Sequence, residues 1–144
     1  MMIRIFNNIL DKLDIEYMRD DIKEEKIIRY ICDYKDTDGD GFRFTLAINK
    51  KYKIFGLFST PIIKVEESRR LEVLELINKI NTKIIYGQLY IDEDEDLVYH
   101  IGASLEGENP INYMQINDYV TYMYSCLKEV TVASTEVAST HLED

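Results

Sequence analysis

Apolar residues recur every three or four positions in three stretches of the chain. The first covers residues 3–13, the second covers residues 66–81, and the third runs from about residue 109 or 112 to residue 130. This spacing places the apolar side chains on one face of an α-helix. Asn109 and Asn112 are both suited to cap the third stretch, because a short polar side chain accepts a hydrogen bond from the first free amides. The pattern therefore predicts three amphipathic helices.

Between these stretches, apolar residues alternate with polar ones or gather in short β-branched and aromatic runs. The clearest alternation is FRFTLAIN at 42–49, and a period of two is typical of a strand with one buried face. Proline donates no hydrogen bond to a sheet, so Pro61 ends the run before it. Further runs of this kind cover residues 26–34, 53–60, 84–91 and 97–105. Five strands are expected.

The expected order of elements is α-β-β-β-α-β-β-α, which is typical of an α+β fold. We expect residues 1–130 to form a single α+β domain, with a five-stranded antiparallel sheet and the helices mainly on one of its faces. The last segment, TVASTEVASTHLED at 131–144, repeats VAST and is rich in small polar residues. Such a composition buries little apolar surface, so we expect a flexible or frayed tail.

The segment DTDGDG at 36–41 resembles the first half of a calcium-binding EF-hand loop. Such a loop also needs a bidentate Glu at its twelfth position and a helix on either side. The twelfth position here is Ala47, Arg43 adds a positive charge at the eighth, and both flanking runs are predicted strands. We therefore interpret Asp36 to Asp40 as a hairpin turn, and we expect no calcium, no other metal and no cofactor.

Composition and charge exclude several classes of partner. The chain has 144 residues, of which 46% are hydrophobic and 31% charged, as in a single folded domain. It contains no run of about 18 apolar residues, and its first residues mix acidic with apolar ones, unlike a signal peptide. We expect a cytoplasmic protein that binds no membrane.

The net charge of −10 is unevenly distributed along the chain. Residues 1–83 hold 16 Lys and Arg against 15 Asp and Glu, whereas residues 84–144 hold one against 12. An acidic surface repels the phosphate backbone, and no basic stripe with interleaved aromatic residues is present. Nucleic-acid binding is therefore not expected.

Few residues in the sequence could support catalysis. Cys32 and Cys126 lie far apart and have no CxxC spacing, and His100 lies on the predicted strand at 97–105, opposite its core face. A pair of Cys32 and His100 across the sheet is geometrically possible, so a small enzyme or ligand-binding domain that uses either residue stays open as the alternative. Because no partner group is evident for either residue, we expect no enzyme.

Tyrosine dominates the aromatic residues, with eleven tyrosines and no tryptophan. Several tyrosines lie off the predicted core stripes. Tyrosine combines apolar area with a hydrogen-bonding hydroxyl and is enriched at protein interfaces. We predict a protein-binding or dimer-interface surface formed by Tyr86, Tyr90, Tyr113, Tyr119, Tyr122 and Tyr124.

The run VLELINKINTKIIYGQLYIDEDEDLVYHIGASLEGE at 73–108 joins a helix ending in Asn78 and Asn81 to a glycine-containing strand, an acidic turn and a second strand. With the order of elements, it resembles the YbjN-domain family, described as candidate bacterial sensory transduction regulators. The resemblance covers most of residues 5–128. It implies a fold similar to that of type III secretion chaperones, which are small acidic dimers that hold extended segments of a client. It implies no catalytic motif.

From this resemblance we expect a non-catalytic homodimer, either a chaperone-like protein or a regulatory adaptor, that binds a segment of a partner protein. The segment would pair with an open sheet edge or lie against Tyr86 and Tyr90. The acidic turn from Asp92 to Asp96, together with Glu106 and Glu108, would steer partners that carry Lys and Arg. Of the two asparagines, we expect one to cap the helix and the other to bond the backbone at the turn that follows.

Overall fold

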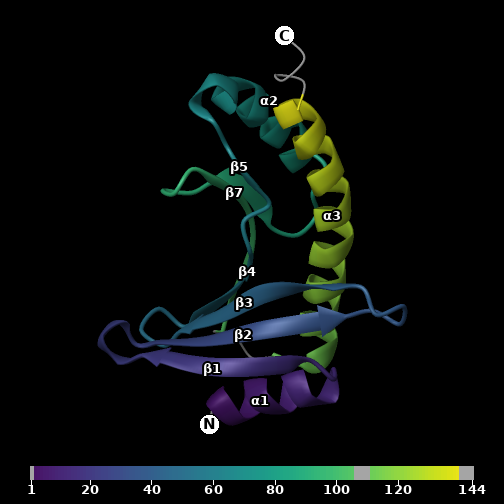
Figure 1. Cartoon of the computed structure of the whole chain (residues 1–144). Coiled ribbons are helices and arrows are strands. Elements are labelled where there is room, and N and C mark those ends of the chain that lie inside the picture. Colours follow the sequence, from purple (N-terminus) through teal and green to yellow (C-terminus); the bar gives the residue numbers. More distant parts are fainter. Residues whose placement is uncertain (1, 106–110, 140–144) are drawn as a thin grey trace.

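The computed structural model describes residues 2–105 and 111–139, and within these ranges the chain forms three α-helices and seven β-strands (Figure 1). The helices are α1 (Met2–Lys12), α2 (Arg70–Asn81) and α3 (Tyr113–Ser139). The strands are β1 (Glu16–Ile22), β2 (Ile27–Lys35), β3 (Gly41–Asn49), β4 (Ile54–Ser59), β5 (Ile63–Lys64), β6 (Gln88–Ile91) and β7 (Asp96–Ser104). Two short 3-10 helices, Lys23–Glu25 and Glu67–Arg69, precede β2 and α2.

All seven strands belong to one antiparallel sheet. Strands β1 to β4 follow one another as a meander, and β7 pairs with β4. Both β4 and β6 pair with His100, and both β5 and β6 pair with Leu97. Strand β6 therefore lies on one side of β7, and β4 and β5 lie on the other.

The three helices cover the same face of this sheet. The ring centroid of Phe55 in β4 lies 5.7 Å from that of Phe6 in α1 and 6.3 Å from that of Tyr119 in α3. Helix α2 adds Val73 and Ile77 to the same buried core. In Figure 1, α1 lies below the sheet, α3 runs along its right side and α2 lies above, beside the end of α3. No described helix lies over the opposite face of the sheet, which we call the open face.

The prediction of an α+β domain with an antiparallel sheet is confirmed, but the prediction of five strands is wrong. Strand β1, EYMRDDI, was not among the five predicted strands, and charged residues occupy both of its faces. It is an edge strand in which Arg19 and Asp21 share the helix-covered face and pair at 3.0 Å, while Asp20 bonds Arg29 of β2 on the open face. The other additional strand, β5, has only two residues and follows the break at Pro61.

Element boundaries differ from the expectation at residues 84–87 and 67–69, whereas the start of α3 agrees with one of the two predicted caps. Residues 84–87 are not in a strand, because the turn after α2 is longer than predicted. Residues 67–69 form a 3-10 turn, so α2 begins only at Arg70. Helix α3 begins at Tyr113, and Asn112 acts as its cap by accepting a hydrogen bond from the Gln115 amide at 3.0 Å. The other predicted cap, Asn109, lies outside the described residues.

Helix α3 continues to Ser139, so residues 131–139 of the segment that we expected to be flexible or frayed are helical in the structure. Val130 and Ser134 are buried one turn apart, and Val137 packs against the core from the next turn. The Ser134 hydroxyl donates to the Val130 carbonyl at 2.7 Å, which satisfies a buried polar group. Packing against the rest of the domain thus overrides the low helix propensity of the Thr, Val and Ser residues. Residues 140–144 of the predicted tail lie outside the described residues.

None of the helices in the described part of the chain combines the length and the hydrophobicity that crossing a membrane requires.

Candidate functional site

The DTDGDG segment forms the hairpin turn between β2 and β3 that the sequence predicted. One carboxylate oxygen of Asp36 accepts hydrogen bonds from the amides of Asp38 and Asp40 at 2.9 and 3.0 Å. The other accepts the Tyr124 hydroxyl at 3.0 Å. Burial raises the pKa of Asp36, but these hydrogen bonds outweigh it and lower the pKa overall. The Asp36 carboxylate therefore closes the turn and fastens it to α3.

The acidic turn between β6 and β7 repeats this geometry. One carboxylate oxygen of Asp92 accepts the amides of Asp94 and Asp96 at 2.9 and 3.0 Å. Asp92, Asp94 and Asp96 each bring a carboxylate oxygen within 4.8 Å of the others, the group among the described residues that could hold a cation. Lys64 Nζ lies 3.9 Å from the Asp96 carboxylate, and Arg70 pairs with Glu95. The hydrogen bonds that close the turn and these ion pairs account for the close approach of the three carboxylates.

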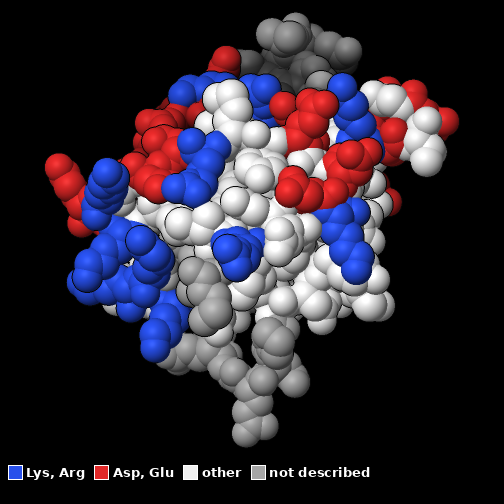
Figure 2. Space-filling model, turned by 90° about the horizontal axis from the view of Figure 1, so that it is seen from below, with Lys and Arg blue, Asp and Glu red and all other residues white. Residues whose placement is uncertain are grey.

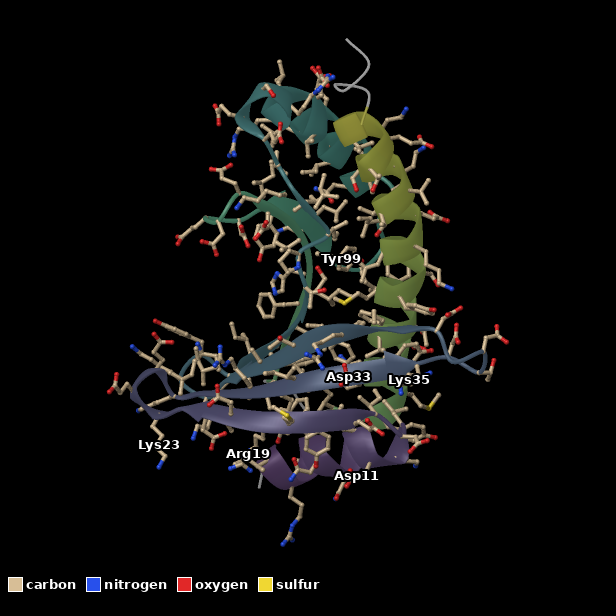
Figure 3. All side chains as sticks on the ribbon, in the orientation of Figure 1. Asp11, Arg19, Lys23, Asp33, Lys35 and Tyr99 are labelled. Atoms are coloured by element: carbon tan, nitrogen blue, oxygen red, sulfur yellow. The ribbon has the colours of Figure 1, made fainter. Side chains whose placement is uncertain are left out.

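Three of the predicted binding tyrosines contact one another between α3 and the turn after α2. The Tyr86 ring meets the rings of Tyr119 and Tyr122 edge to face, with centroids 5.2 Å apart in both pairs. The Tyr122 hydroxyl accepts the Ile85 amide at 2.7 Å. Tyr99, which lies between β7 and α3 in Figure 3, donates its hydroxyl to the Tyr86 carbonyl. This cluster holds α3 to the turn, and 39% of the Tyr86 surface remains exposed.

The other three predicted tyrosines lie apart from this cluster. The Tyr124 ring stacks on Phe42 with centroids 5.4 Å apart. Tyr113 keeps 38% of its surface exposed, and Lys12 Nζ lies 3.6 Å from its ring centroid. Tyr90 lies on the open face, where its ring meets His100 at 6.5 Å. The structure thus groups three of the six tyrosines in one cluster, leaves the other three apart from it, and puts only Tyr90 on the open face.

Cys32 and His100, the residues of the alternative enzymatic interpretation, lie on opposite faces of the sheet. Cys32 is fully buried beneath the helices, and burial raises the pKa of its thiol to about 12. A thiol that stays protonated is a poor nucleophile. His100 lies on the open face, and burial lowers the pKa of its imidazole. The pair considered from the sequence therefore does not form.

The open face carries a row of small residues that crosses three strands. Ala47 of β3 pairs with Gly56 of β4, which pairs in turn with Gly102 of β7. The neighbouring rows hold larger side chains, with Phe58 and His100 on one side and Asn49 and Ile54 on the other. The small residues thus form the floor of a trough that runs across the strands.

This trough has a volume of about 310 Å³. The rings of Phe58 and His100 stack in one wall, with centroids 4.4 Å apart. His100 leans over the floor so closely that a Cβ atom added at Gly56 would lie 2.9 Å from its Nε2. The trough is lined by Ile27, Ala47, Asn49, Ile54, Phe55, Gly56, Phe58, His100, Gly102 and Ala103. A single imidazole among mainly apolar walls suits an apolar guest better than acid-base chemistry.

Comparison with known proteins places this fold in a family. The model of the YbjN family, described as "Putative bacterial sensory transduction regulator", matches residues 6–122. The chain belongs to the YbjN family. A search of curated proteins finds no match to the chain.

The YbjN match runs from α1 into α3 and includes all seven strands, so the complete trough lies within the family region. The asparagine pair that carried the YbjN resemblance has a structural role at one position. The Asn81 side chain accepts the Leu89 amide at 2.8 Å and donates to the Leu89 carbonyl at 3.1 Å, on the outer edge of β6. Asn78 is exposed, and its carbonyl accepts the Thr82 amide.

Two edge strands of the YbjN sheet, β6 and β1, therefore carry features that oppose strand addition. Asn81 occupies the backbone groups of Leu89 on β6, and β1 presents the charged residues Arg19, Asp20 and Asp21. Charged side chains on an edge strand oppose pairing with another chain. The open face, in contrast, is accessible.

Sequence reasoning missed the trough because its floor depends on strand register. Ala47, Gly56 and Gly102 lie far apart in the sequence, and only their pairing makes them a continuous row. A weak signal was available, since each is a small residue in the middle of an apolar strand. Glycine within a strand often marks a close approach to the sheet.

Proposed function

We propose that this protein is a non-catalytic binding module, a regulatory adaptor or chaperone-like protein, that holds a segment of a partner protein in the trough on its open face. The trough is the observation that carries the proposal. A floor of Ala47, Gly56 and Gly102 lets a guest approach the sheet backbone closely, and the walls offer aromatic and aliphatic contacts. The regulator description of the YbjN family agrees with a role in binding.

The bound segment lies on the open face and does not extend the sheet. The pairing with a sheet edge that we expected from the sequence is opposed at β6 by Asn81, which already bonds Leu89, and at β1 by charged side chains. Lying on the face demands no unpaired edge, only a groove and apolar walls. Tyr90, which contacts His100 in the wall of the trough, is the predicted binding tyrosine that this arrangement uses.

The remaining predicted tyrosines belong to a second part of the proposal. Tyr86 and Tyr113 are large and half exposed, so each offers area to a partner or to a second protomer. Tyr119, Tyr122 and Tyr124 support such a surface by holding α3 in place. Their direct contact with a partner stays a prediction, as does the steering of basic partners by the turn from Asp92 to Asp96.

A homodimer and a cytoplasmic location in a bacterium complete the proposal. The dimer would form through α2, whose Leu71 and Leu74 are 69% and 41% exposed. Residues three apart on a helix lie on the same side, so the two leucines form one apolar strip. Exposed apolar strips of this kind are typical of interaction surfaces.

Selection of random twelve-residue peptides displayed on phage, against the full chain, tests the proposed function. Enriched peptides should bind the wild-type protein and bind Ala47→Leu at least tenfold more weakly, because the larger side chain fills the trough. Thr45→Leu is the matched control, since Thr45 lies on the same strand and face but does not line the trough. Failure to enrich any peptide, or equal binding by Ala47→Leu and Thr45→Leu, would contradict the proposal.

A further inference from the structure

Five lysines gather at one end of the sheet, in the turns that follow β1 and β3. They are Lys23, Lys26, Lys50, Lys51 and Lys53, and we call them the lysine corner. The two turns touch, because the Lys50 amide donates to the Lys26 carbonyl at 3.0 Å. Figure 3 shows Lys23 at this end and Lys35 at the other end of the same strands, and Figure 2 shows basic residues gathered on the same side. A meander brings its first and third turns to one end, which explains the cluster.

The lysine corner borders one wall of the trough. Ile27, Asn49 and Ile54 line that wall, and each directly adjoins a lysine of the corner, namely Lys26, Lys50 and Lys53. The lysines therefore follow the wall across β2, β3 and β4, in the direction in which the trough runs. No residue of the acidic turn from Asp92 to Asp96 lines the trough.

Among the described residues of these two turns, the charge is positive, although the whole chain carries −10. Glu24 and Glu25 share the first turn, but these two carboxylates do not balance Lys23, Lys26, Lys50 and Lys51, even with Lys53 left out of the count. Among the described residues, Lys23, Lys26 and Lys50 form no ion pair with an acidic side chain. Because charges farther apart than about 8–10 Å are screened at physiological salt, a ligand in the trough interacts mainly with the charges that border it, and Lys26, Lys50 and Lys53 directly adjoin lining residues.

We infer that the trough binds an acidic peptide segment, one that places a large apolar side chain on the floor and Asp or Glu side chains against the lysine corner. This inference rests on the proposed function and names the chemical class of the partner. The floor crosses three strands, two strand spacings of about 4.8 Å, which suits about three residues of an extended peptide. The carboxylates on the corner side of such a segment lie along the row of lysines.

Three peptide libraries of equal diversity test this inference with the full chain. All three carry Phe or Leu at two central positions, and their flanks are Asp and Glu in the first, Lys and Arg in the second, and Ser and Gln in the third. The acidic library should be enriched at least tenfold over each of the others. In the double variant Lys26→Glu with Lys50→Glu, the preference for the acidic library should fall about tenfold or invert, because two attractive contacts become repulsive.

The control is Lys35→Glu with Lys79→Glu, which changes the net charge equally at exposed positions away from the trough. This variant should keep the acidic preference. Lys26→Gln with Lys50→Gln, which adds no repulsion, should show a smaller loss and guards against misfolding of the Glu variant. A preserved preference in the control, together with a smaller loss in the Gln variant than in the Glu variant, supports the inference.

Three outcomes would overturn it. Equal enrichment of the three libraries, or a preference for the basic one, would refute the inference that the bound segment is acidic. The proposed function would still stand in that case if Ala47→Leu abolishes binding of the enriched peptides. An equal loss of the acidic preference in Lys26→Glu with Lys50→Glu and in the control Lys35→Glu with Lys79→Glu would assign the effect to net charge and not to the lysine corner. Displacement of the acidic peptides by dodecanoate below the concentration at which the peptides bind would assign the trough to a fatty acid.

Discussion

At the scale of single residues, Asn81 links the end of α2 to the outer edge of β6. Its side-chain amide bonds both backbone groups of Leu89, as a neighbouring strand would. The expectation that one asparagine of the pair bonds the backbone after the helix is confirmed at this position. At Asn78 it is the backbone carbonyl that takes part in the end of α2, where it and the Ile80 carbonyl accept the Thr82 amide.

Replacing Asn81 by Ala should lower the free energy of unfolding by about 1–3 kcal/mol, because two part-buried backbone groups of Leu89 lose their partners. Urea denaturation followed by circular dichroism measures the change. Asn78→Ala is the control and should stay within about 0.5 kcal/mol of the wild type, since Asn78 is exposed. Equal effects of the two substitutions would show that the bonds to Leu89 contribute nothing.

His100 makes the stability of the protein depend on pH. Burial lowers the pKa of its imidazole, so between that pKa and the ordinary value of about 6.5 the unfolded state binds more protons than the folded state. The stabilisation is complete above about pH 6.5 and is lost as the pH falls through the folded pKa. The urea midpoint of the wild type should therefore drop more between pH 7.5 and pH 5.5 than that of His100→Gln. Identical drops of the urea midpoint in the two proteins would contradict this prediction.

At the scale of elements, prediction succeeded where one periodicity dominated and failed where packing decided. The strand at 42–49 was predicted within one residue because its apolar and polar positions alternate without exception. Strand β1 was missed because its neighbours, and not its own pattern, make it a strand, and Arg19 and Asp21 occupy its inner face. The end of α3 was missed because its residues favour a helix only when they pack against the domain.

Replacing Ser134 by Asp should destabilise the protein by about 3 kcal/mol or more, because it buries an unpaired charge where the wild-type side chain is fully buried. Thermal unfolding monitored by circular dichroism measures the effect. The adjacent Thr135 is exposed, so Thr135→Asp should change stability by less than about 1 kcal/mol. If α3 were frayed beyond residue 130, the two variants would unfold at the same temperature.

At the scale of the whole molecule, we predicted the candidate site from the types of residue in the sequence. The site in the structure depends instead on strand register and sheet topology. Tyrosines off the core stripes were expected to face a partner, but α3 turns Tyr119, Tyr122 and Tyr124 toward aromatic neighbours within the chain. Their periodicity could not reveal which segments would lie opposite α3. The trough exists only once β3, β4 and β7 are aligned side by side, and the lysine corner exists only once β2 and β3 are paired.

The proposed homodimer predicts a concentration-dependent mass in size-exclusion chromatography with light scattering. Leu71→Glu with Leu74→Glu should give the monomer mass at every concentration, because it places charges on the exposed apolar strip of α2. Val132→Glu, a substitution of an equally exposed apolar residue on α3, should leave the mass unchanged. A wild type that stays monomeric at high concentration would rule out this dimer.

The pairing of β4 with β7 also sets the order in which the chain can fold while it is being synthesised. Strand β4 ends at Ser59 and β7 begins at Asp96, and at about 5–20 residues per second the intervening residues take roughly 2–7 s to translate. During this interval the hydrogen-bonding edge of β4 has no neighbour and is open to pairing with another nascent chain. Helix α1, which is made first, is already available to cover the ring of Phe55. The half-made sheet thus gains a cover for its apolar face well before it gains a partner for its edge.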